Sequence, residues 1–70
     1  MDPDAAWRAL LAALDSGDRD RVLETAAALA GWLGRGGFPP DTTGTVTSPE
    51  WHRRIAECAC RVAIDIASRW

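Results

Sequence analysis

The sequence has no lysine, a single histidine, two cysteines and no long hydrophobic run. A zinc site needs about four ligands that converge on one point, and these residues are too few to supply them. A membrane-spanning helix needs about 20 consecutive apolar residues, so this pattern argues against a membrane-embedded chain. The net charge of −2 argues against a generic binder of nucleic acids or membrane surfaces.

The two cysteines stand two residues apart on a predicted helix, at positions 58 and 60. Their side chains therefore point about 200° from each other, and they cannot form a disulfide with each other. No basic leader precedes the first apolar segment, which begins with acids. Reduced thiols and this N-terminal composition favour a cytoplasmic location.

Catalytic chemistry is not indicated by the remaining polar residues. His52 lies six residues before Cys58, about 120° around the same predicted helix, and no acid is placed to orient it. The glycine-rich segment 34–37 follows a helix instead of a strand, which favours a chain reversal over a phosphate-binding loop. We expect no metal, no cofactor and no enzymatic activity.

Chain length limits the protein to one domain, residues 1–70, with a marginal core. Hydrophobic residues make up 47% of the chain, which argues against disorder. Chains of this size usually gain stability from disulfides, a metal or a partner subunit. The first two are not indicated here, so the composition favours a partner.

Apolar residues recur at helical spacing in three segments and predict an all-α, three-helix domain. The helices are expected over about residues 3–14, 19–33 and 49–69, the first two as an antiparallel hairpin, with a loop over 34–48. Asp2, Asp18 and Ser48 are suited to cap the helix N-termini, and Gly17 and Gly34 to end the first two helices.

The third predicted helix carries an apolar face about 120° wide, which we expect to face the core. Ile64 and Cys60 are expected to point away from that face. The cations Arg53 and Arg54, next to Trp51 and His52, oppose the dipole of the helix N-terminus, a local mismatch that can mark a functional site. The residues expected in the core-facing arc are Trp51, Ile55, Cys58, Ala59, Val62, Ile66 and Trp70.

The Gly17-Asp18 turn and the stretch Trp32-Leu33-x-x-Gly36-Gly37-Phe38-Pro39-Pro40 resemble those of a group of short, uncharacterised bacterial helical proteins. The resemblance covers roughly residues 10–40. It implies a helical hairpin followed by a fixed loop, and it implies no activity. We expect Phe38 and Val46 to pin this loop to the helices.

The sequence favours a non-catalytic protein-interaction module that associates with itself or docks on a larger protein. We expect Trp32, Phe38, Ile64 and Trp70 to make contacts, and Arg53 and Arg54 to steer the partner by charge. One alternative is a small nucleic-acid-binding regulator that uses Arg53, Arg54, Arg61 and Arg69. Another is a small phage or defence-system inhibitor of a larger enzyme, for which no particular residue argues.

Overall fold

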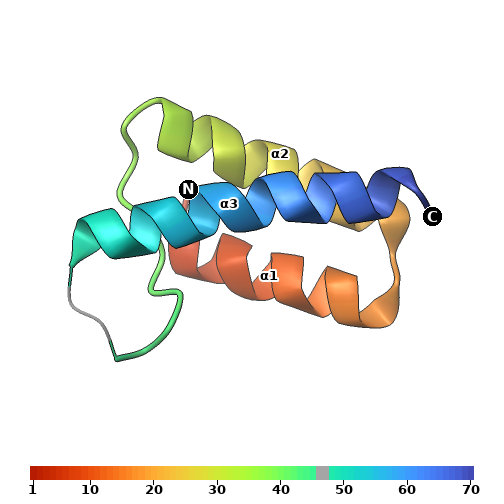
Figure 1. Ribbon diagram of the computed structural model, residues 1–70, viewed down its shortest axis with the longest axis horizontal. Helices are drawn as coiled ribbons and strands as arrows, with labels where there is room; N and C mark the ends of the chain where they lie inside the picture. The colour runs from red at the N-terminus through yellow and green to blue at the C-terminus, as the bar shows by residue number, and fades with distance from the viewer. Residues whose placement is uncertain (46–47) are drawn as a thin grey trace.

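Three helices account for most of the computed structural model, which describes residues 1–45 and 48–70. They are α1 (Pro3–Ser16), α2 (Arg19–Gly34) and α3 (Pro49–Ser68), and the described residues contain no strand. Figure 1 shows α1 and α2 as an antiparallel hairpin, with α3 running in the same direction as α1. The predicted all-α, three-helix architecture is therefore confirmed.

The helix boundaries follow the capping residues that the sequence marks. Asp2 accepts hydrogen bonds from the backbone N–H groups of Asp4 and Ala5, and Asp18 accepts one from that of Arg21. Ser48 caps α3 in the same way. These side chains satisfy N–H groups that have no partner within the helix. Gly17 ends α1 with a φ of 71°, a conformation that favours glycine.

The end of α2 lies slightly beyond the predicted one. Gly34 is the last residue of α2, and Gly36, not Gly34, takes the left-handed conformation, with a φ of 83°. The N–H of Gly37 donates to the carbonyl of Trp32, and the N–H of Gly36 donates to that of Leu33. This pair of bonds is a Schellman motif, which turns the chain sharply away from the helix axis.

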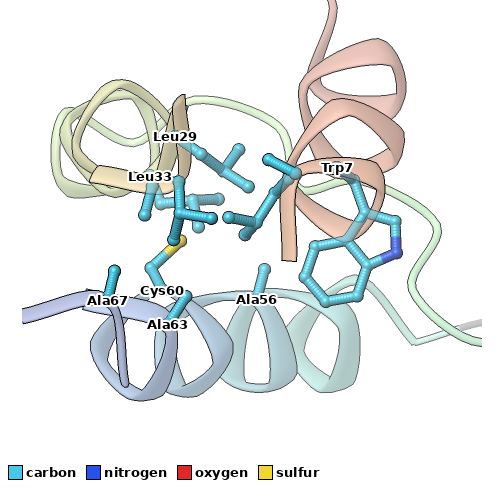
Figure 2. Packing of buried hydrophobic residues seen from close by; sticks show 11 residues of the cluster. Trp7, Leu29, Leu33, Ala56, Cys60, Ala63 and Ala67 are labelled. Carbon is cyan, nitrogen blue, oxygen red and sulfur yellow. The ribbon is translucent and has the colours of Figure 1, made fainter. Parts of the chain in front are cut away.

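The core combines large side chains from α1 and α2 with small side chains from α3. Trp7 points from α1 and Leu29 and Leu33 point from α2 toward α3 (Figure 2). α3 faces these large side chains with a row of small residues. The small residues are spaced four, three and four positions apart, so that they share one face of the helix. This small-residue row consists of Ala56, Cys60, Ala63 and Ala67, each almost completely buried.

The predicted core face of α3 is wrong, because most of its large residues lie on the surface. Trp51 is 47% exposed, Val62 50% and Ile66 40%, and Cys58 is exposed as well. Ile55 and Ala59 are partly buried against the edge of the core. The face that packs inward is the small-residue row, about a third of a turn away.

The positions of Cys60 and Ile64, which were expected to point away from the core, also differ from the prediction. Cys60 is 1% exposed and belongs to the core, and Ile64 is partly buried against it. Helical periodicity locates apolar arcs but does not choose between two adjacent ones. The volume of the side chains decides which arc faces inward, since close packing of α3 on α2 leaves room only for small side chains between the helices.

We expect Ala63→Leu to lower the free energy of unfolding by about 1–3 kcal/mol, because the added atoms have no space between α3 and α2. Val62→Leu, one residue away on the exposed side, should change it by less than about 0.5 kcal/mol. Chemical denaturation followed by far-UV circular dichroism, at low protein concentration, measures both. A larger loss for the Val62 variant would show that α3 packs through the opposite face.

Candidate functional site

An exposed apolar strip runs along α3 on the side that does not pack against the hairpin. We call it the α3 outer face and define it as Trp51, Ile55, Cys58, Val62 and Ile66. Ile55 is its most buried member and joins it to the core. Successive members are three or four residues apart, so their side chains form one continuous ridge. Sequence analysis found this arc but assigned it to the interior.

The first helix carries a further exposed apolar residue. Leu11 is 47% exposed and follows Trp7 by one helical turn. Trp7 points from α1 toward the N-terminal half of α3 (Figure 2), so Leu11 lies on the α3 side of α1. Large exposed apolar residues are common singly, but a contiguous group is typical of an interaction surface.

The contact residues predicted from the sequence do not form one cluster. Ile64 packs against the core, whereas Trp70 is 48% exposed just beyond the end of α3. Phe38 is 69% exposed on the loop, so its ring does not pin the loop to the helices. Val46, the other expected pin, lies outside the described residues.

Trp32 holds the start of the loop, and its role in partner contacts stays a prediction. Its indole N–H donates to the carbonyl of Phe38 over 2.8 Å. Gly37 lies directly against the ring, because a Cβ at this position would be 2.4 Å from a ring carbon. The spacing of Trp32, Gly37 and Phe38 therefore has a structural explanation: their mutual contacts stabilise the chain reversal that follows α2.

Arg53 also holds the loop, and its role in charge steering stays a prediction. Its guanidinium donates to the carbonyl of Leu33 at 2.9 Å and to the carbonyl of Gly37 at 2.7 Å. Both acceptors belong to the C-terminal end of α2 and its cap. A cation is favourable there, because the C-terminal end of a helix carries partial negative charge.

The middle of the loop is fixed by a histidine that sequence analysis did not assign to any structural role. His52 is buried, and its Nδ1 accepts a hydrogen bond from the backbone N–H of Thr42 at 3.1 Å. The Nε2 atom of His52 lies 3.8 Å from the Asp41 carboxylate. The backbone N–H of Asp41 donates to the Asp4 side chain, which connects the loop to α1. The loop is thus anchored to all three helices.

Arg54 points to solvent, unlike Arg53. It lies 4.0 Å from Glu50, one turn before it, and both side chains are highly exposed. Arg54 also lines an open surface hollow together with Ala30, Glu57 and Arg61. Arg69 makes a similar pair with Asp65 at 3.4 Å. Acids therefore alternate with the outward-facing cations of α3, an arrangement that does not favour phosphate binding.

The two thiols differ in environment. Cys58 is exposed on the α3 outer face, and Cys60 is buried in the core. Burial raises the pKa of the Cys60 thiol, and the nearby Glu57 carboxylate raises it further. A thiol with a raised pKa stays protonated at neutral pH and reacts slowly. Cys60 therefore contributes packing and Cys58 is the accessible thiol.

Among the described residues, no group of three or more histidine, cysteine or acidic side chains is arranged to hold a metal ion. Within the same residues, no helix has the length and apolar character needed to cross a bilayer. Comparison with protein-family models, with curated proteins and with solved structures finds no match to this chain.

We expect one fast and one slow thiol in a titration with a maleimide at neutral pH. Cys58 should react rapidly, and Cys60 only when the protein unfolds or the pH rises well into the alkaline range. Because the pKa of Cys60 is raised in the folded state, its protonated form stabilises the fold below the ordinary thiol pKa. This contribution is lost as the pH rises through the folded pKa.

Mass spectrometry of Cys58→Ser and Cys60→Ala variants assigns the two rates. Equal reactivity of both thiols in the native protein would contradict the burial of Cys60.

We expect Gly37→Ala to lower the free energy of unfolding by about 1–3 kcal/mol, because the methyl group would collide with the Trp32 ring. Gly34→Ala is the matched control, since its Cβ would meet open space at the end of α2. That change should be neutral or stabilising by up to about 1 kcal/mol. Thermal unfolding and the tryptophan emission spectrum measure both variants. Equal stability of the two would mean that Trp32 does not lie on Gly37.

Proposed function

We propose that this protein is a non-catalytic protein-interaction module that binds its partner through the α3 outer face. The observation that carries the proposal is the exposure of Trp51, Val62 and Ile66 along one ridge of a well-capped helix. Removing apolar area from water contributes about 25 cal/mol per Å², so covering this ridge is favourable. Tryptophan is also one of the residue types enriched among the dominant contacts of protein interfaces.

The rigidity of the ridge supports the same proposal. The interior row of α3 packs against the hairpin, and the N-terminal end of the helix is tied to the loop by His52 and Arg53. A surface that is already ordered loses little conformational entropy when a partner binds. The partner is a protein in this proposal, either a further copy of the chain or a larger protein.

We expect the double variant Val62→Glu/Ile66→Glu to weaken partner binding by more than about tenfold, because two carboxylates would have to be desolvated in the interface. Ala27→Glu/Ala28→Glu is the matched control, with the same charge change at exposed positions of α2. Both variants should remain folded. Immobilised wild-type protein and both variants are compared for capture of purified copies of the chain and of proteins from a cell extract.

The comparison between variants decides the outcome. Loss of a bound protein from the α3 variant, with retention by the α2 variant, supports the proposal. Identical capture by all three proteins would contradict it.

A further inference from the structure

A row of charged residues with alternating sign borders the α3 outer face on one side. At about 100° per residue, these positions lie along the border of the outer face that is opposite Ile55 and Ala59, and Arg54, Glu57 and Arg61 line a surface hollow there with Ala30 of α2. The opposite border of the outer face adjoins the core, through Ile55 and Ala59. The charged row consists of Glu50, Arg54, Glu57, Arg61, Asp65 and Arg69.

The charges of this row are complementary to those of a second copy of the row that runs in the opposite direction. Read from the N-terminal end, the charges are negative, positive, negative, positive, negative and positive. When the row is reversed, each acid stands opposite a cation. Glu50 meets Arg69, Arg54 meets Asp65, and Glu57 meets Arg61, each pair in both directions.

We infer that the partner of the α3 outer face is a second copy of this chain, with the two α3 helices antiparallel. The inference rests on the proposed function and names its partner. In an antiparallel helix pair, the same border of each helix meets its counterpart, so the charged row faces itself. In a parallel pair, the charged row of each helix would face the opposite border of its partner, where Ala59 lies, and the six charges would not meet.

The apolar and charged parts of the surface have nearly the same centre. The charged row is centred between residues 59 and 60, and the outer face, from Trp51 to Ile66, is centred between residues 58 and 59. A single two-fold axis near this point therefore superposes the two ridges and pairs the charges. It also brings the two exposed Cys58 side chains near each other, beside the axis.

A cross-linking experiment tests the direction of the two helices. Glu50→Cys and Arg69→Cys are prepared separately in a Cys58→Ser background, one of them with an affinity tag. The antiparallel arrangement places residue 50 of one copy beside residue 69 of the other. A short thiol cross-linker should therefore join tagged to untagged chains in the mixture and should not join Glu50→Cys to itself. Circular dichroism verifies that the variants are folded, as expected for exposed positions.

Light scattering and sedimentation of the wild-type chain give the association state in parallel. We expect a dimer whose dissociation constant rises about fivefold or more in Arg54→Glu, because the new carboxylate faces Asp65 of the second copy. The reciprocal change Arg54→Glu/Asp65→Arg should restore association. Arg8→Glu, with the same charge change on α1, is the control and should associate like the wild type.

The outcomes separate this inference from the proposed function. A dimer with cross-links between residues 50 and 69, and with restoration by the double reversal, supports the antiparallel pair. Cross-links of residue 50 to itself overturn it in favour of a parallel pair. A monomer up to about 100 μM also overturns it. In that case the proposed function still holds if capture of another protein is lost in Val62→Glu/Ile66→Glu.

Discussion

The close approach of α3 to the hairpin is the constraint on which the rest of the structure depends. It is possible because four positions of α3 carry only alanine or cysteine where the helix meets the leucines of α2. With such small side chains on one helix, the large ones of the other two fill the interior. Trp7 closes the end of the core near Ala56 (Figure 2). Larger residues in the row would separate the helices and leave voids beside them.

The same constraint determines what the surface looks like. α3 has apolar residues over two adjacent arcs, and a three-helix domain of this size buries only one of them. Volume selects the arc of small residues, so the larger Trp51, Val62 and Ile66 are left half exposed. Fully burying a side chain of this kind contributes about 1.5–3 kcal/mol. A part of that contribution is unrealised in the isolated chain and becomes available when a second surface covers the ridge.

Local signals in the sequence predict the helices and their ends well. Asp2, Gly17, Asp18 and Ser48 act within three or four residues of their own position, so their neighbours in the sequence are enough to identify them. The inward face of α3 was mispredicted because periodicity weights large apolar residues. The useful signal was the row of small residues, whose meaning depends on the size of the side chains on α2.

The loop was harder still, because its contacts are long range. Its anchors join Arg53 to carbonyls 16 and 20 residues away and His52 to a backbone N–H ten residues away. No local pattern pairs such positions.

Arg53 also explains a conflict that the sequence raises. A cation near the N-terminus of α3 opposes the dipole of its own helix, which made the segment around it a candidate functional site. In the fold, the guanidinium lies at the C-terminal end of α2, whose last turn contains no basic residue. There it donates to the carbonyls of Leu33 and Gly37 at the negative end of the α2 dipole, so an unfavourable position in one helix is favourable for another.

This use of Arg53 has a consequence for the surface. It joins the end of α2, the loop and the start of α3 into one connected unit on the inner side of α3. The outer face, beginning with Trp51, is therefore displayed from a fixed helix, and of its members Ile55 alone packs against the core.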